Sequence, residues 1–75
     1  MRYFFDIRDN FYAADDEDGV EYSDSAAARR EALKVATSIA EDLFIANGSE
    51  ISVTVRDKDG PLFELIVNLQ TKELR

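Results

Sequence analysis

The chain has 75 residues, of which 45% are apolar and 33% are charged, and it contains no cysteine and no histidine. This length accommodates one small domain, so we expect a single domain over residues 1–75, with a polar C-terminal tail over residues 70–75. The missing residue types exclude disulfides, thiol catalysis and the commonest general bases and metal ligands.

The net charge of −7 comes from 16 acidic and 9 basic residues, and the excess lies in one segment. Between positions 9 and 24 there is no base, and the acids there are Asp9, Asp15, Asp16, Glu17, Asp18, Glu21 and Asp24. A negative field repels phosphate backbones and anionic lipids, so we expect neither nucleic acid nor a membrane as a partner. The acidic loop, residues 15–18, would suit a basic protein or a cation; alternatively, it is only solvated.

Targeting signals are also missing from the sequence. No apolar run approaches the ~20 residues that span a bilayer. The opening Met1-Arg2-Tyr3-Phe4-Phe5-Asp6 lacks the basic region, apolar stretch and cleavage site of a secretory signal. We therefore expect a cytoplasmic location.

The first third of the chain predicts short strands. Residues 2–8 alternate between apolar and other side chains with a period of two, as in a strand with one apolar face. After the turn signal at Asp9-Asn10, residues 11–14 are predicted to return as a second, antiparallel strand. Extended character resumes briefly over residues 20–22.

A helix is predicted over residues 25–46, where no proline or glycine interrupts an alanine-rich stretch. Ser23-Asp24-Ser25 supplies candidates for its N-cap, and Asn47-Gly48 is typical of a helix end. Its apolar stripe consists of Ala32, Val35, Ala36, Ile39, Ala40 and Leu43, widened by Leu33 and Phe44.

Two more strands follow over residues 50–57 and 61–69, joined by a tight turn at Asp57-Lys58-Asp59-Gly60. The order hairpin, helix, hairpin predicts an α+β two-layer sandwich, with one helix on one face of a mostly antiparallel sheet of about four strands. The predicted strand order is 11–14, 2–8, 50–57, 61–69. The predicted core comprises the helix stripe with Tyr3, Phe5, Ile7, Ile51, Val53, Val55, Phe63, Leu65 and Val67.

One helix leaves the other face of the sheet uncovered. That face is predicted to be mostly polar, with three apolar exceptions at Phe4, Leu62 and Ile66. If these three side chains cluster, they form an apolar patch of the kind that marks association surfaces. The alternative is that they are single, scattered apolar residues.

The acidic loop fails the spacing test for a calcium-binding EF-hand loop. Such a loop needs oxygen ligands at its first and last positions, and aligning Gly19 to its glycine puts Ala14 and Ser25 there. Asp15, Asp16 and Asp18 are therefore only weak candidates for binding a divalent cation.

No pattern in the sequence indicates catalysis. Asp6 is predicted to pair across strands with Arg2, Arg8 or Arg56. Glycine-rich phosphate loops and nucleophile elbows are missing. We therefore predict no catalytic residue, no cofactor and no enzyme.

Two stretches carry a resemblance that covers nearly the whole chain. Arg2-Tyr3-Phe4-Phe5-Asp6-Ile7-Arg8-Asp9 resembles the opening R-Y-F-F-[DH]-[IL]-x-D of a family of small proteobacterial proteins known only as a domain of unknown function. Asp16 to Glu21 with Asp24 and the helix start at 26–32 is similar to that family's second block, although Asn10 replaces a usual glycine. The resemblance implies a compact α+β domain without assigned chemistry. A fainter similarity to HicB-type antitoxin domains implies a toxin partner.

From these observations we predict a non-enzymatic interaction or regulatory module that self-associates through the uncovered sheet face or a sheet edge. Phe4, Leu62 and Ile66 would be its apolar anchors, and Asp15, Asp16, Glu17 and Asp18 would steer a basic partner. The alternatives are a cation-responsive domain that uses residues 15–18 and a HicB-like antitoxin domain.

Overall fold

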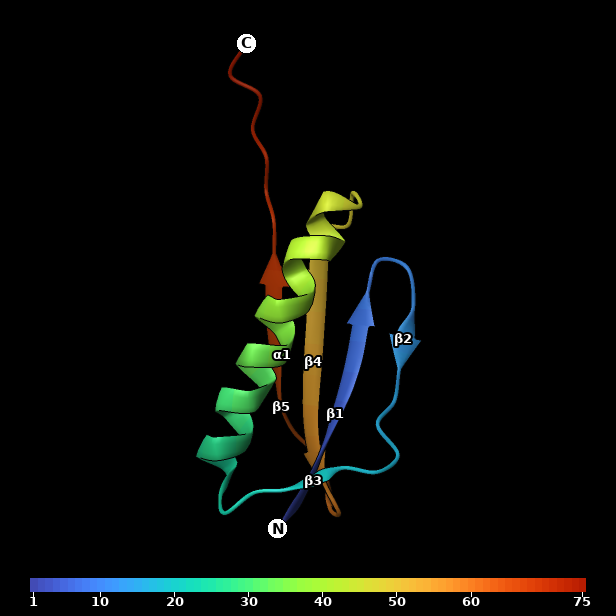
Figure 1. Ribbon diagram of the computed structural model, residues 1–75, viewed down its shortest axis with the longest axis vertical. Helices are drawn as coiled ribbons and strands as arrows, with labels where there is room; N and C mark the ends of the chain where they lie inside the picture. Colours follow the sequence, from blue (N-terminus) through green and yellow to red (C-terminus); the bar gives the residue numbers. More distant parts are fainter.

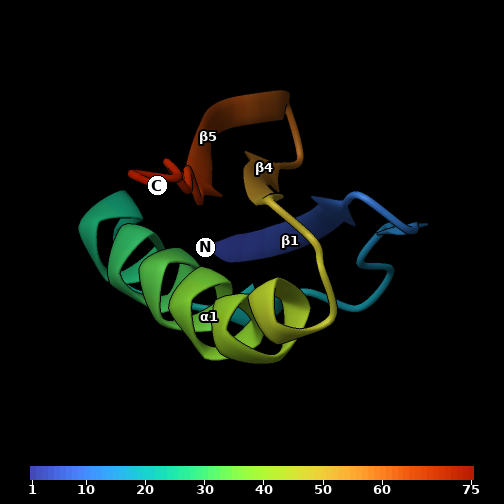
Figure 2. The ribbon, with the colours of Figure 1, turned by 90° about the horizontal axis from the view of Figure 1, so that it is seen from above.

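The computed structural model describes residues 1–75 and contains one helix packed on one face of an antiparallel sheet (Figures 1 and 2). The elements are β1 (Arg2–Asp9), β2 (Ala13–Ala14), β3 (Val20–Glu21), α1 (Ser25–Ile45), β4 (Glu50–Asp57) and β5 (Gly60–Asn68). The sheet order is β2-β1-β4-β5, and β3 also pairs with β1. The predicted α+β fold and strand order are confirmed, and the short β3 brings the sheet to five strands.

The helix begins and ends where its capping residues indicate. The Asp24 carboxylate accepts a hydrogen bond from the Ala27 N–H at 2.9 Å, which satisfies one of the free amides of the first turn. At the other end Asn47 adopts a φ of 69°, and the Gly48 N–H donates to the Leu43 carbonyl at 2.8 Å. This left-handed residue stops the helix, as expected for Asn-Gly.

The core lies between the small residues of α1 and the middle of β4. The side chains of Ile51, Val53 and Val55 are fully buried. They face a helix stripe of buried residues that consists of Ala28, Ala32, Ala36, Ala40 and Leu43. Alanine leaves little side chain between helix and sheet, so the two layers approach closely.

The predicted helix stripe was wrong at one position and incomplete at another. Leu33 is 53% exposed, whereas the unpredicted Ala28 is fully buried. Arg29, one turn before Leu33, lies over the Phe63 ring of β5, the last strand of the sheet. Leu33 therefore projects on the flank of the helix where the sheet ends, and no further strand covers it.

The predicted strand over residues 11–14 is shortened to Ala13–Ala14. The Asp9 carboxylate accepts hydrogen bonds from the Phe11 and Tyr12 N–H groups, at 2.7 and 3.1 Å. This local turn draws both aromatic residues out of the ladder, and they are exposed.

The β4–β5 hairpin has the predicted tight turn, with Gly60 at a φ of 123°. A bulge follows, because Val55 pairs with Phe63 while Arg56 pairs with Pro61, and Leu62 is left as the extra residue. Beyond β5, the Leu69 N–H donates to the Ser49 carbonyl at 2.8 Å, and the exposed tail then projects away from the domain (Figure 1).

Candidate functional site

The three apolar residues predicted on the uncovered face do not form a patch. Phe4 lies opposite Arg56, and Ile66 lies opposite Ser52, four residues away from Arg56 along β4. Strands are about 4.8 Å apart and residues rise about 3.4 Å each, so Phe4 and Ile66 occupy opposite corners of the face. Leu62 is separated from Ile66 on β5 by Glu64. The clustering that would make these residues a joint anchor is therefore not present.

Phe4 is also covered by its neighbours. The Arg56 guanidinium lies 4.5 Å from the centre of the Phe4 ring. A Cβ added to Gly19 would stand 2.9 Å from both Phe4 Cε1 and the Tyr3 carbonyl oxygen, so the loop backbone is in close contact with β1. Phe4 thus packs within the domain, whereas Leu62 and Ile66 are 47% and 53% exposed.

The acidic loop is attached to β1 through Asp16. One oxygen of its carboxylate accepts the Phe5 N–H at 3.2 Å, and the other accepts the N–H groups of Asp18 and Gly19, both at 3.1 Å. The Asp16 N–H in turn donates to the Asp6 carboxylate at 2.9 Å. Asp16 therefore holds the loop in place, while Asp15, Glu17 and Asp18 are exposed.

An ion pair supports this attachment from the uncovered face. Arg56 Nε donates to the Asp6 carboxylate at 2.7 Å, and Arg56 Nη2 donates to the Asp16 carbonyl oxygen at 2.6 Å. Of the three arginines predicted as partners for Asp6, Arg56 is thus the one used. The guanidinium joins the sheet to the loop.

The pKa values of the two carboxyls follow from these contacts. Partial burial raises the pKa of Asp6, but the hydrogen bonds from Arg56 and from the Asp16 N–H outweigh it, and the pKa lies below its usual value. Burial likewise raises the pKa of Asp16. The three backbone N–H donors and the nearby Arg56 charge lower it by more, so the pKa of Asp16 also lies below its usual value. Both side chains are therefore held as carboxylates.

These contacts seal the outer edge of β1. Ile7 pairs with Ala14 of β2, and Tyr3 pairs with Val20 of β3. Between these pairs the Phe5 N–H meets the Asp16 carboxylate in place of a strand. The Asp9 N–H, at the end of β1, donates to the Tyr12 carbonyl at 3.0 Å. We call this side of the sheet the sealed edge.

The outer edge of β5 has no such cover, because β5 is the last strand and pairs only with β4. In an antiparallel ladder, alternate residues direct their N–H and C=O groups to opposite sides. The Leu69 N–H points to β4, so the intervening even-numbered residues point outward. We call the outward backbone of Glu64, Ile66 and Asn68 the open edge.

Apolar side chains surround the open edge on both faces of the sheet. Leu62 and Ile66 are exposed on the uncovered face, and Leu33 is exposed on the flank of α1. On the helix face, half-buried side chains line the edge strand, namely Phe63, Leu65 and Val67. An unpaired strand with apolar neighbours is a template for pairing with another chain.

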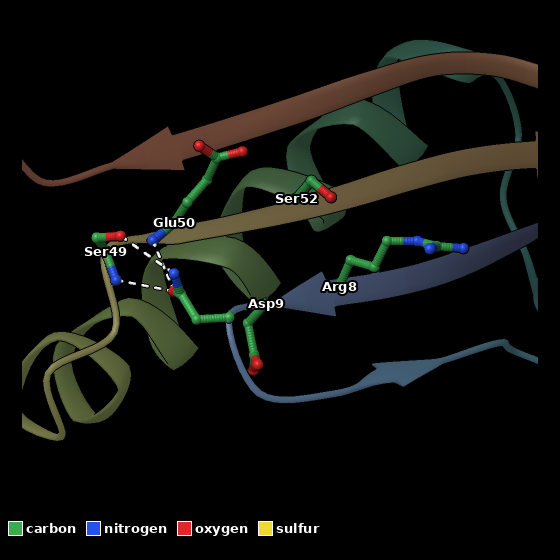
Figure 3. Close-up of a pocket in the computed structure, with 6 residues that line it drawn as sticks. Arg8, Asp9, Ser49, Glu50 and Ser52 are labelled. Carbon is green, nitrogen blue, oxygen red and sulfur yellow. Dashed lines mark hydrogen bonds between the residues drawn. The ribbon is translucent and has the colours of Figure 1, made fainter.

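Two hollows near the β1–β2 turn are weaker candidates for a binding site. A polar hollow of about 340 Å³ lies beside the end of β1 (Figure 3) and is lined by Arg8, Asp9, Asn10, Ser49, Glu50 and Ser52. The Arg8, Asp9 and Glu50 side chains diverge in Figure 3 and do not converge on a ligand position. The Asn10 amide instead bonds the segment that enters β4, accepting from the N–H groups of Ser49 and Glu50 at 2.8 and 3.0 Å.

The second hollow is an apolar groove of about 380 Å³ between the β1–β2 turn and the C-terminal half of α1. Phe11 and Tyr12 line it from the turn, and Ile39 and Leu43 line it from the helix. Asp9 and Asp42 also line the groove, but the Asp9 carboxylate is bonded to the N–H groups of the turn. No three acidic side chains in the structure are placed to hold a metal ion.

The fold and its two edges define the chain as a small α+β domain with one sealed and one open sheet edge. Residues 2–68 match the family model of the DUF6894 domain of unknown function, and the chain belongs to this family. No curated protein and no solved structure matches it. The single helix is too polar along its length to cross a bilayer.

The sequence alone missed the residues of the open edge, apart from Ile66. The signal was present, because the predicted strand order puts residues 61–69 at an edge, and β5 carries only one charged residue, Glu64. The role of Asp16 had no such signal, since its neighbours in the acidic loop look alike in sequence.

Proposed function

We propose that this chain is a non-enzymatic, cytoplasmic protein-interaction domain whose binding element is the open edge. In this proposal the edge accepts an extended strand from another polypeptide, which extends the sheet by main-chain hydrogen bonds. The observation that carries it is the contrast between the edges. The outer side of β1 is paired with β2 and β3, and the N–H groups of Phe5 and Asp9 have acceptors within the domain, whereas the outward groups of Glu64, Ile66 and Asn68 have no strand beside them.

The side chains of β5 are consistent with this use. Edge strands that avoid pairing usually carry several charges, inward-pointing lysines or prolines along their length. From Gly60 to Asn68 this strand has one acid, no base, and a proline only at its second position. Glu64 is thus the only charged residue of β5 that would disfavour pairing with another strand.

The acidic loop has a smaller part in this proposal than the sequence suggested. The exposed Asp15, Glu17 and Asp18 would attract a partner with basic residues, which adds to the rate of encounter. Asp16 is excluded from that role because its carboxylate is occupied by three N–H donors. No observation favours the cation-responsive or the HicB-like alternative.

The proposal can be tested by NMR with ¹⁵N-labelled protein and end-blocked nine-residue peptides. Valine would alternate with lysine, with glutamate or with threonine in three separate peptides. We expect at least one peptide to shift the amide signals of Glu64, Ile66 and Asn68, and to leave those of Phe5 and Ile7 in place. Equal shifts at both edges, or no shift at the open edge of a chain that is monomeric at the concentration used, would contradict strand addition there.

A matched pair of variants isolates the backbone contribution. Ile66→Pro removes an outward N–H without removing a bond to β4, while Ile66→Thr keeps that N–H and a β-branched side chain. We expect the proline variant to lose the peptide-induced shifts and the threonine variant to retain them, with both still showing the helical circular dichroism of α1.

A further inference from the structure

We infer that the strand accepted by the open edge is β5 of a second copy of this chain, aligned antiparallel about a two-fold axis at Ile66. This inference rests on the proposed function and names its partner. The two copies would form one continuous sheet, with β5 of each at its centre.

The distribution of charge favours this meeting of two acidic molecules. Each chain carries a net charge of −7, but residues 60–69 contain a single acid and no base. The acidic loop is attached to β1, with β4 between it and β5. Pairing through β5 therefore joins the least charged sides and keeps the two acidic loops at the outer ends of the joint sheet. Distance and salt screening then weaken their repulsion.

The outward backbone groups restrict the alignment to a few registers. A two-fold axis at Glu64 would place this carboxylate opposite its own copy, which is unfavourable. An axis at Leu65 would place Glu64 opposite Ile66, a charge against an apolar side chain. The first register pairs Leu62 with Ile66 but sets two carboxylates against each other, and the second sets a charge against an apolar side chain.

An axis at Ile66 makes the strand self-complementary. Ile66 then lies opposite Ile66 of the other copy, and Glu64 lies opposite Asn68, whose side-chain amide can donate to the carboxylate. On the helix face the register pairs Leu65 with Val67 and Phe63 with Leu69. Every apolar residue of this stretch meets an apolar residue.

The exposed flank of α1 fits the same arrangement. A two-fold axis perpendicular to the sheet keeps both helices on one face, with the flanks above β5 turned toward each other. Leu33 projects from that flank with 53% of its surface exposed, and Phe63 and Leu65 beneath it are half-buried. A second copy would cover apolar surface that the isolated domain leaves in water.

Cysteine trapping tests the register directly, because the chain has no cysteine of its own. In the inferred register the two Ile66 Cα atoms would be about 5.5 Å apart, within the range that a disulfide spans. Ile66→Cys with oxidised glutathione should therefore give a covalent dimer. Glu64→Cys is the matched control: its two copies would be about 14 Å apart, and we expect about tenfold less covalent dimer.

A mixture of Glu64→Cys and Asn68→Cys should regain the cross-link, because those positions face each other in this register. Light scattering of the unmodified chain over a tenfold dilution should show a dimer. Ile66→Lys should convert this dimer to a monomer. Leu74→Lys, a control in the exposed tail, should leave it a dimer. Preferential cross-linking of Glu64→Cys alone would overturn the register in favour of an axis at Glu64.

The same experiments separate this inference from the proposed function. Suppose that the chain is monomeric, that Ile66→Cys shows no preferential cross-linking, and that the open-edge amides still respond to the peptides. This result would overturn the second copy as partner and would leave strand addition standing. A monomer whose open edge also ignores the peptides would overturn both.

Discussion

The two edges of the sheet differ in whether their outward backbone groups find hydrogen-bond partners within the domain. At β1, outward backbone groups are met by two short strands, by the Asp16 carboxylate and by the turn at Tyr12. At β5, the last strand of the sheet, nine residues pair with β4 on one side and have no strand on the outer side. Part of a sheet edge can thus be closed by a carboxylate that accepts a strand N–H where the carbonyl of a neighbouring strand would otherwise accept it. The acidic loop lies against the edge formed by β1, and the edge formed by β5 has no partner strand within the domain.

The loop that closes the sealed edge depends on close backbone contact at Gly19. Gly19→Ala should lower the free energy of unfolding by about 3 kcal/mol, because a Cβ would meet the Tyr3 carbonyl and the positive φ adds backbone strain. Gly60→Ala is the control, since Gly60 also has a positive φ but has open space around it. Urea unfolding should show a clearly smaller loss for Gly60→Ala, and equal losses would mean that the Gly19 contact does not matter.

The Asp16 carboxylate, which bonds the Phe5 N–H in place of a neighbouring strand, is expected to make the next largest contribution to stability. Asp16→Ala leaves three N–H groups without their acceptor, and we expect about 2 kcal/mol less stability toward unfolding. Glu17→Ala, at an exposed neighbour in the same loop, should change the stability by less than about 0.5 kcal/mol. Amide exchange should also accelerate at Phe5 in the Asp16 variant alone. A matching loss in both variants would show that the loop's net charge is what stabilises it.

Acid should weaken the sealed edge and not the open one. The pKa values of Asp6 and Asp16 are lower in the folded chain than in the unfolded chain, so their contribution is complete above the unfolded pKa of about 3.9 and is lost as the pH falls through their folded values. We therefore expect the free energy of unfolding to decrease from this source as the pH falls below about 4. Asp16→Asn, which cannot titrate, should give a shallower decline in urea midpoint between pH 4 and pH 2; an identical decline would assign the acid sensitivity to other carboxyls.

Substitutions at the open edge should have the smallest effect on the isolated domain. Ile66 is 53% exposed, so Ile66→Thr should change the free energy of unfolding of the dilute chain by less than about 0.5 kcal/mol. A loss comparable to that of Asp16→Ala in dilute solution would mean that the open edge also stabilises the monomer, and the division of roles between the edges would fail.

Much of the fold was predictable because it depends on local patterns. The period-two alternation in β1, β4 and β5, the cap at Asp24 and the stop at Asn47-Gly48 each act over a few residues, and the structure confirms them. The predicted second strand was too long because the Asp9 side chain competes for the Phe11 and Tyr12 amides. Local hydrogen bonding by an aspartate can thus override an apolar stretch.

The candidate site was predictable only in part, because it depends on register. The sequence placed Phe4, Leu62 and Ile66 on one face, but only the pairing of β1 with β4 and of β4 with β5 set them apart. The burial of Leu33 was predicted wrongly for a similar reason. Leu33 fits the apolar stripe of the helix, yet the sheet ends beneath it, and its side chain is exposed.

The sequence by itself determined the elements, their order and the excess of acid in one loop, since propensity, periodicity and capping act between near neighbours in the chain. The tertiary structure alone decided which acid of that loop is structural and how the edge of β1 is closed. Asp16 differs from Asp15 and Asp18 only through groups that the fold brings to it, namely the Phe5 amide and the Arg56 guanidinium. Contacts between residues 11 and 40 positions apart follow from the alignment of strands, which no local pattern records.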